Sequence, residues 1–276
     1  MSQPIENNSQ YTQDEMMTVT AARQLADGAV CFVGIGLPSA ACNLARELHA
    51  PNLVLIYESG TVGTKPRVLP LSIGDGELAE TAEVVIPLPE IFTHYLQAGR
   101  VDIGFLGAAQ IDRFGNLNST AIGPYDNPKV RLPGAGGAPE IATHAKSVLV
   151  IMRMSPKSFV SELAFRTSSG FLGGNGERAA RGYPGRGPQA VITDFGVLRP
   201  HPETDELVLT DIYPGVDAAD AIAACGWPLQ VADELQLLAP PTATELAQLR
   251  ALNERTRVAH AMPVKIPLVP KSFNAV

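Results

Sequence analysis

The chain has 276 residues, of which 45% are hydrophobic and 18% charged, and these fractions exclude an intrinsically disordered protein. The net charge is −7, and no stripe of basic residues is present to neutralise phosphates, which argues against a nucleic-acid partner. Three cysteines without Cys-x-x-Cys spacing, each among apolar neighbours, predict buried side chains and neither a disulfide framework nor a zinc site.

The start of the chain differs in character from the rest. Residues 1–11 are polar and acidic, and we expect them to form a disordered leader, not a secretory signal. No apolar run approaches the roughly 20 residues that a membrane span requires, so we expect a cytoplasmic protein without a membrane partner. No sharp change in composition follows, which predicts a single domain over residues 12–276.

The first predicted element is a helix. Thr12 and Glu15 match a capping box, and the apolar spacing after them predicts a helix that ends near Gly28. Three further elements are predicted from apolar runs and a helix-starting proline: a buried strand at 29–35, a helix at 38–48 and a strand at 53–57.

The same alternation of strands and helices continues to the end of the chain. Strands are predicted at 83–86, 100–106, 147–152, 190–193, 207–209 and 229–231, and helices at 89–96 and 242–256. Such alternation predicts an α/β fold, with an open, mainly parallel sheet and helices on both faces. The segment 168–188 is rich in Gly, Arg and Pro, which predicts a long functional or mobile loop.

Glu58 stands at the end of a predicted strand, in the sequence Tyr-Glu-Ser-Gly at 57–60. Ligands of open α/β sheets bind beyond the carboxyl ends of parallel strands, where this side chain would lie. Three interpretations are open: an ordinary charge at a strand end, the ribose-binding acid of a dinucleotide fold, or a nucleophile. An exposed carboxylate can attack an activated acyl group and form a covalent intermediate.

The dinucleotide interpretation rests on the turn Gly34-Ile-Gly36, which follows a strand and precedes a helix. Two details speak against it. Ser39 stands where the fingerprint has its third glycine, and Pro38 removes an amide that the phosphate cradle would use.

A second glycine-rich run offers donors for an acyl transfer. Gly134, Gly136 and Gly137 let backbone amides approach a ligand closely, and a helix beginning near Pro139 would bring its positive end there. A plain turn between a strand and a helix is the alternative.

Five motifs together resemble one protein family. They are YESG at 57–60, LSIGDGELAETA at 71–82, VDIGFLGAAQIDRFGNLNST at 101–120, NPKVRLPGAGGAPEIA at 127–142 and ITDFGVL at 192–198. In this order, over about residues 12 to 255, they are similar to the B subunits of family I coenzyme A transferases, the glutaconate and 3-oxoadipate types in particular. Several long motifs in register are more specific than one short motif.

This resemblance implies a mechanism and a partner. Glu58 would be the catalytic glutamate that attacks the thioester of succinyl-CoA, and the resulting glutamyl–CoA thioester would pass CoA to a dicarboxylic acid. Since the motifs resemble those of the 3-oxoadipate type, 3-oxoadipate is the expected acceptor. The enzyme would then act in the degradation of aromatic compounds. The family's Gly-rich segment, which supplies amides to the oxyanion and acyl-CoA, falls on Gly134, Gly136, Gly137 and Ala138. The active site would lie between this chain and an A subunit of similar fold, without any cofactor, since CoA is carried by a substrate.

Other residues are candidates for binding the substrate. Gly36 would lie in a turn near the acyl pocket, and Asn118 either bonds a substrate carboxylate or holds a turn. Arg131 either binds carboxylates through two hydrogen bonds or remains a solvated charge. In the long loop, three arginines are candidates for CoA phosphates, with ordinary exposed side chains as the alternative: Arg178, Arg181 and Arg186.

Other functions stay open beside the transferase. A glutaconate-type transferase would use the same residues, and a CoA-thioester hydrolase or decarboxylase would share the fold. Relatives of those latter kinds tend to lack the glutamate that Glu58 supplies, which favours transfer. A dinucleotide-binding module is the alternative from a different functional class.

Overall fold

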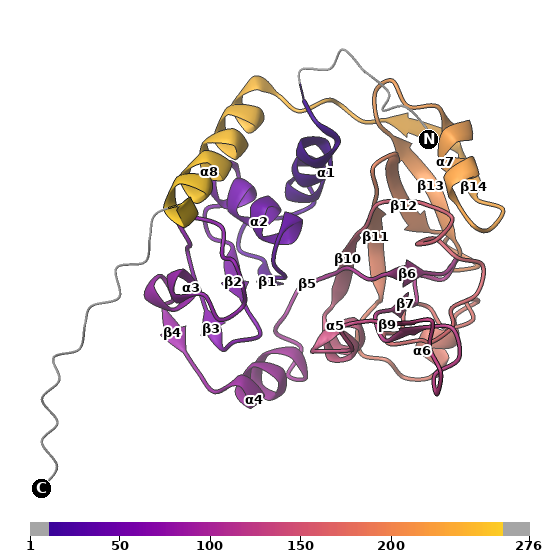
Figure 1. Cartoon of the computed structure of the whole chain (residues 1–276), viewed down its shortest axis with the longest axis horizontal. Helices are drawn as coiled ribbons and strands as arrows, with labels where there is room; N and C mark the ends of the chain where they lie inside the picture. Colours follow the sequence, from indigo (N-terminus) through magenta and orange to yellow (C-terminus); the bar gives the residue numbers. More distant parts are fainter. Residues whose placement is uncertain (1–10, 262–276) are drawn as a thin grey trace, which may run out of the picture.

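The computed structural model describes residues 11–261 (Figure 1). The predicted leader lies outside the described residues except for Tyr11, which packs against the hydrophobic core. The end of the predicted domain, residues 262–276, also lies outside them. The division into a leader and one domain therefore stays a prediction.

One ten-stranded sheet runs through the described part of the chain, in the order β14-β13-β12-β11-β10-β5-β1-β2-β3-β4. Its centre, from β11 to β2, is parallel, and antiparallel pairs flank it on both sides. The α/β fold with a mainly parallel sheet is thus confirmed. The strands are β1 (Val30–Phe32), β2 (Val54–Ile56), β3 (Thr61–Val62), β4 (Val84–Val85), β5 (Ile103–Leu106), β10 (Ser147–Ile151), β11 (Pro188–Ile192), β12 (Gly196–Pro200), β13 (Leu207–Ile212) and β14 (Gln230–Leu237).

Two small sheets lie in the long connection between β5 and β10. They are formed by β6 (Gln110–Ile111) with β7 (Leu117–Asn118), and by β8 (Ala121–Ile122) with β9 (Val130–Arg131). Figure 1 shows them below and beside the large sheet, close to α5 and α6. The sequence did not predict these two-residue strands, because they are too short to show an alternation of apolar and polar residues.

Helices cover both faces of the sheet, as predicted. They are α1 (Gln13–Ala22), α2 (Leu37–Leu48), α3 (Gly76–Glu80), α4 (Leu88–Glu90), the π-helix η1 (Ile91–Leu96), α5 (Ala138–His144), α6 (Glu177–Ala180), α7 (Ala218–Ala224) and α8 (Ala243–Ala261). One buried cluster joins α1 and α2 to one face, and a second joins η1 and α5 to the other.

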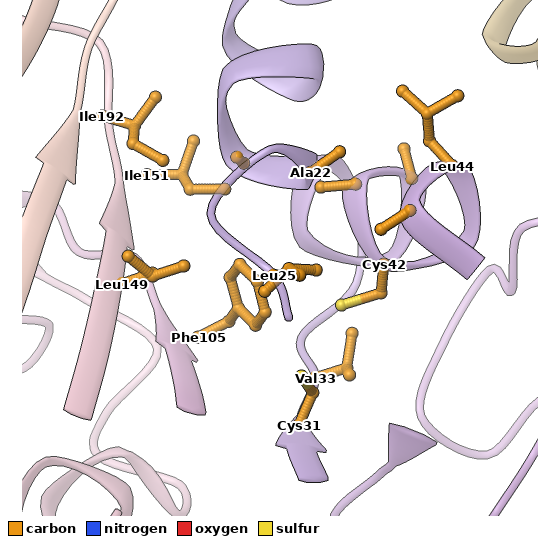
Figure 2. Packing of buried hydrophobic residues seen from close by; sticks show 14 of the residues in the cluster. Ala22, Leu25, Cys31, Val33, Cys42, Leu44, Phe105, Leu149, Ile151 and Ile192 are labelled. Carbon is orange, nitrogen blue, oxygen red and sulfur yellow. The ribbon is translucent and has the colours of Figure 1, made fainter. Parts of the chain in front are cut away.

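The first cluster contains two of the three cysteines. Cys31 on β1 and Cys42 on α2 are buried among Leu25, Val33 and Leu44, as Figure 2 shows. Burial raises the pKa of the Cys42 thiol well above its ordinary value. Both side chains therefore act as small hydrophobic groups, as their apolar neighbours in the sequence predicted.

Element ends differ from the predictions in two instructive places. The first helix ends at Ala22, before the predicted end near Gly28, because Gln24 and Leu25 bond to carbonyls three residues back and tighten the last turn. The helix predicted at 89–96 divides into α4 and the π-helix η1, where Gln97 N–H donates to Phe92 five residues back.

Neither β12 nor α7 was predicted.

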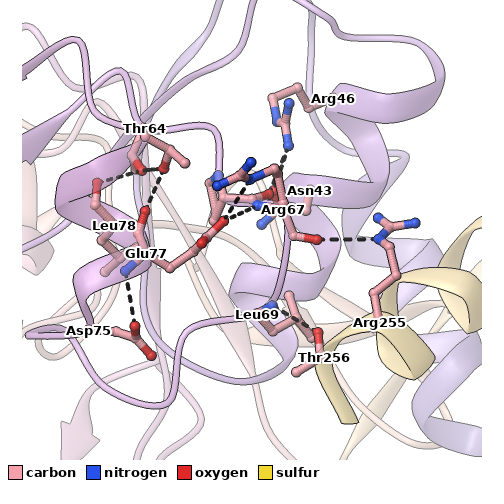
Figure 3. A network of polar contacts seen from close by, with 12 residues as sticks. Asn43, Arg46, Thr64, Arg67, Leu69, Asp75, Glu77, Leu78, Arg255 and Thr256 are labelled. Carbon is pink, nitrogen blue, oxygen red and sulfur yellow. Dashed lines mark hydrogen bonds and ion pairs between the residues drawn. The ribbon is translucent and has the colours of Figure 1, made fainter. Parts of the chain in front are cut away.

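The stretch between β3 and α3 is held by a network of polar contacts (Figure 3). The N–H of Leu69 donates to the Thr256 hydroxyl on α8 at 2.9 Å, and Arg255 donates to the Arg67 carbonyl at 3.3 Å. The Glu77 carboxylate accepts the Arg67 N–H at 2.6 Å. Helix α8 thereby fixes the segment that follows the predicted site turn at 57–60.

Candidate functional site

The order of the strands brings Glu58 and the glycine-rich loop together at the carboxyl ends of the parallel strands. Strand β1 lies between β2, which Glu58 follows, and β5, to which the chain crosses from β4 on the β2 side of the sheet. The loop at 132–137 enters α5, which packs on β5 and leads into β10. In open α/β sheets, such a reversal of strand order marks the ligand-binding crevice at the carboxyl ends of the strands.

Tyr57 fixes the backbone from which Glu58 projects. Its ring is buried in the first core cluster, and its hydroxyl lies 2.7 Å from the Ser39 hydroxyl on α2. Tyr57 also closes the turn, because its N–H donates to Thr61 and its carbonyl accepts the N–H of Gly60. The buried ring therefore anchors one end of the turn that presents Glu58.

Glu58 lies on the same face of the sheet as the second core cluster. Leu55 and Tyr57 belong to the first core cluster, whereas Ile56 belongs to the second. Glu58 follows in the turn after β2, and its carboxyl lies beside Gly137 at the start of α5. Helices η1 and α5 lie on the face of the second cluster.

The Glu58 carboxyl lies directly against the glycine-rich loop. A Cβ placed on Gly137 would be 3.3 Å from Glu58 Cδ, and one on Gly136 would be 4.0 Å from Glu58 Oε2. The structure thus brings together three of the predicted site residues, although they are about 80 positions apart in the sequence.

Two of the predicted amide donors are already engaged, which corrects that part of the prediction. The N–H of Gly134 donates to the Ser119 carbonyl at 2.8 Å, and that of Ala138 donates to Ala135 at 3.1 Å. Gly134 is tied to a neighbouring strand connection, and Ala138 closes the turn that begins α5.

The unused amides are those of Ala135, Gly136 and Gly137, for which residues 11–261 contain no acceptor. Gly136 has φ +50°, in the left-handed region, and Gly137 has φ −81°, in the right-handed region. Two successive residues of opposite handedness turn their N–H groups toward the same side and form a concavity that can bind an anion. The sequence analysis missed Ala135. The signal was present, because in a Gly-Ala-Gly-Gly run the amide of the alanine is as accessible as those of the glycines.

Aromatic rings form one wall of the site. Phe92 on η1 lies so close to Gly137 that an added Cβ would be 2.8 Å from its Cζ. Its ring centre is 6.0 Å from that of the buried Phe32 on β1. Nothing in the sequence distinguished Phe92 from other apolar residues of its helix.

Asn118 is buried and has no free polar group for a ligand, so the structure supports its turn interpretation. Its amide donates to Gln110 and to the Ala121 carbonyl, and its oxygen accepts the N–H groups of Thr120 and Ala121. Asn116 likewise holds the turn after β6, through Asp112 and the backbone of the long loop.

The remaining predicted substrate-binding residues lie on the surface. Arg131 is exposed, with its guanidinium 5.0 Å from the centre of the Tyr125 ring and bonded to the Tyr125 carbonyl at 3.1 Å. Gly36 is exposed in the turn from β1 to α2, with φ +85°. Because β1 and β2 are parallel, this turn lies at the same sheet edge as Glu58.

Arg178 of the long loop is a structural residue, which corrects its candidacy for CoA phosphates. It is buried, and its guanidinium donates to backbone carbonyls of the loop and of the end of α5: Ala142, Thr143, Ser169, Gly170 and Gly185. Burial lowers its pKa to about 10. Arg181 pairs with Glu177 at 2.7 Å, and Arg186 bonds the Ser147 hydroxyl at 3.2 Å.

Two kinds of feature are absent from the part of the chain that the structure describes. None of its helices combines the length and apolar character needed to cross a membrane. Among the same residues, no group of three or more His, Cys, Asp or Glu side chains could hold a metal ion.

Comparisons with known proteins identify similar sequences. Residues 14–224 match the coenzyme A transferase family. The chain is 57% identical over 252 residues to the B subunit of the 3-oxoadipate CoA-transferase from Pseudomonas knackmussii, covering 91% of this chain and 97% of that protein.

Two solved structures have a similar fold. The glutaconate coenzyme A-transferase from Acidaminococcus fermentans superposes with a TM-score of 0.84 at 33% identity, over 93% of this chain and 100% of that one. The decarboxylase AibA/AibB superposes with a TM-score of 0.75 at 28% identity, over 88% and 95% of the two chains.

Proposed function

The chain belongs to the coenzyme A transferase family, and from this premise we propose that it is the B subunit of an enzyme that moves CoA from succinyl-CoA to 3-oxoadipate. The relative named for 3-oxoadipate, identical at more than half of the aligned positions, supports this acceptor. The observation that carries the chemistry is the Glu58 carboxyl beside Gly137 and near amides that no described residue uses.

In the first step, a Glu58 carboxylate oxygen attacks the thioester carbonyl carbon of succinyl-CoA. The negative charge that develops on the carbonyl oxygen would be stabilised by the N–H groups of Ala135, Gly136 and Gly137, which are held in place before the reaction. The carbon–sulfur bond then breaks, CoA leaves as a thiolate, and a succinyl–glutamyl anhydride remains.

In the second step, the CoA thiolate attacks the glutamyl carbonyl carbon of the anhydride. Succinate leaves, and CoA is now joined to Glu58 as a thioester. The carboxylate of the acceptor acid repeats the two steps in reverse, which gives its CoA ester and restores the free carboxylate. The exchange changes no oxidation state, and we propose that it needs no cofactor.

The proposal includes a partner and a setting. An A subunit would complete the site, because the relatives are B subunits of enzymes with more than one kind of chain. We place the enzyme in the cytoplasm, in the degradation of aromatic compounds, where 3-oxoadipate is the acceptor.

The test is to trap the covalent intermediate. The chain is co-purified with its A subunit, mixed with succinyl-CoA alone, and analysed by peptide mass spectrometry. We expect CoA on the peptide that contains Glu58, and its removal by hydroxylamine. Glu58→Gln should abolish the adduct and lower kcat by several orders of magnitude, as loss of a covalent nucleophile does.

Glu90→Gln is the matched control, because Glu90 is a half-buried glutamate of α4, next to η1, and its carboxylate pairs, among the described residues, only with His94 at 3.8 Å. This variant should keep both the adduct and the turnover. Turnover by the wild-type complex without any adduct would refute the covalent mechanism. Release of free CoA without transfer would favour a hydrolase, and release of CO₂ a decarboxylase.

A further inference from the structure

The glycine-rich loop depends on the orientation of one peptide group, the one between Gly134 and Ala135. Gly134 has φ +109°, in a region that glycine adopts far more readily than other residues. A Cβ at this position would meet nothing within 4 Å. Neighbouring atoms would therefore leave room for a side chain, and the described contacts that orient this peptide are the hydrogen bonds of Gly134.

Ser119 supplies two of these hydrogen bonds. Its carbonyl accepts the N–H of Gly134 at 2.8 Å, and its hydroxyl donates to the Gly134 carbonyl at 2.8 Å. Its own N–H donates to the Thr167 hydroxyl at 2.9 Å, and that hydroxyl lies 2.7 Å from the Thr120 hydroxyl. Ser119 is thus itself fixed, and it is hydrogen-bonded to both the N–H and the carbonyl of Gly134.

Peptide geometry carries the consequence to the next residue. In a trans peptide, the carbonyl of Gly134 and the N–H of Ala135 point in opposite directions. When the Ser119 hydroxyl holds the carbonyl, it also holds the Ala135 N–H on the other side of the loop. That N–H has no acceptor within residues 11–261, and Ala135 is exposed.

We propose that Ser119 is a positioning residue for the transfer reaction, whose hydroxyl keeps the Ala135 N–H available to the oxyanion. The proposal rests on the proposed function of the Glu58 site. Without the hydroxyl, the Gly134 carbonyl loses its hydrogen bond, and Gly134, as a glycine, offers little resistance to rotation of the peptide on its side. Rotation would place a carbonyl oxygen where the N–H stood, and this oxygen would repel the developing charge.

The kinetic test uses Ser119→Ala in the complex with the A subunit. Because an oxyanion donor acts on the transition state and hardly on the bound substrate, kcat should fall about 10- to 100-fold while KM for succinyl-CoA changes less than about threefold. Ser119→Thr keeps a hydroxyl and should restore most of kcat. Ser158→Ala, which also removes a hydroxyl that donates to a backbone carbonyl, should leave kcat unchanged.

The outcomes separate this proposal from the proposed function. If the wild-type complex transfers CoA and Ser119→Ala keeps full kcat, or if the alanine and threonine variants lose kcat equally, the positioning role is wrong and the function stands. If the wild type transfers no CoA, both fail. A crystal structure of the Ser119→Ala complex should show the Gly134–Ala135 peptide rotated or in two orientations, and an unchanged single orientation would overturn the proposal.

Discussion

Gly137 is packed closely against Phe92 and Glu58. A methyl group there would lie 2.8 Å from the Phe92 ring and 3.3 Å from the Glu58 carboxyl carbon, both closer than ordinary contact. The φ of Gly137 is −81°, which any residue adopts. The absence of a side chain at this position therefore allows the close packing of Phe92 and Glu58, and the backbone conformation does not require it.

For this reason we expect Gly137→Ala to lower kcat for CoA transfer by at least about tenfold, since small displacements of reacting groups cost that much or more. The folded state should lose only about 1 to 3 kcal/mol, the usual cost of overpacking. Steady-state kinetics and urea denaturation of the same preparation check the two numbers.

Gly34→Ala is the control for that substitution. A Cβ on Gly34 would meet only Pro38 at 3.9 Å, an ordinary contact, and its φ is not in the left-handed region. This variant should keep its kcat. Equal kcat for Gly137→Ala and the wild type would mean that Glu58 does not react in the position seen here.

Between elements, two ion pairs join the region of α1 to α8: Arg250 with Glu15, and Arg23 with Glu245. Arg23, at the end of α1, donates twice to the Glu245 carboxylate in the first turn of α8, at 2.7 and 2.8 Å, and also to the Ala239 and Pro240 carbonyls. Burial by itself raises the pKa of Glu245, but the bonds from Arg23 and Thr242 outweigh it and lower this pKa to about 2.

This lowered pKa predicts a dependence of stability on pH. The ordinary value is 4.5, so the contribution of Glu245 is fully present above that pH and is lost as the pH falls from 4.5 toward 2. Glu245→Gln should lower the free energy of unfolding by about 1 kcal/mol at pH 7, because the pair is partly exposed. The variant should also lose less stability than the wild type between pH 4.5 and 3.

Urea denaturation at pH 7, 4.5 and 3 measures both effects. Glu162→Gln removes the same charge from an exposed residue that forms no ion pair or hydrogen bond within the described chain, so its curves should follow the wild type. Parallel pH curves for Glu245→Gln and the wild type would show that the ion pair with Arg23 does not stabilise the fold.

In the long loop, too, one arginine joins two distant segments of the chain. Arg178 bonds the carbonyls of Ala142 and Thr143 at the end of α5, while the amides near Glu58 lie at the beginning of that helix. The segment that the sequence predicted to be a functional or mobile loop is therefore tied, by the buried guanidinium of Arg178, to helix α5.

At the scale of the whole molecule, the site is open on one side. Glu58 is only half-buried, and Ala135 and Gly136 are exposed. Water would compete with these amides for the oxyanion, because hydrogen bonds to a developing charge are strongest where water is excluded. A second chain that covers this edge of the sheet would supply the missing enclosure.

We therefore expect the isolated chain to have less than about 1% of the transferase activity of the complex with its A subunit, given the hundredfold or larger effect of such donors. Size-exclusion chromatography and an assay of CoA transfer, on the chain alone and after addition of the A subunit, check this. Full activity of the isolated chain would show that the site is complete without a partner.

Neighbouring residues along the chain were enough to predict the class of fold and to single out Glu58 as a candidate nucleophile. Unbroken apolar runs such as 53–57 predict buried parallel strands, and Glu58 follows one of them directly. The capping box at Thr12 was also readable and is confirmed. These features depend on neighbours within a few positions, or on the order of motifs along the chain, so the linear sequence contains them.

Only the tertiary structure decided which polar groups remain free for chemistry. Ser119 and Gly134, or Arg178 and Ala142, are hydrogen-bonded across many intervening residues, and no local pattern announces such pairs. The amide of Ala135 is available because those of Gly134 and Ala138 are already bonded. Whether a donor is free depends on every group around it in space. For this reason residue type and spacing predicted the glycine-rich loop but not which of its amides remain unbonded.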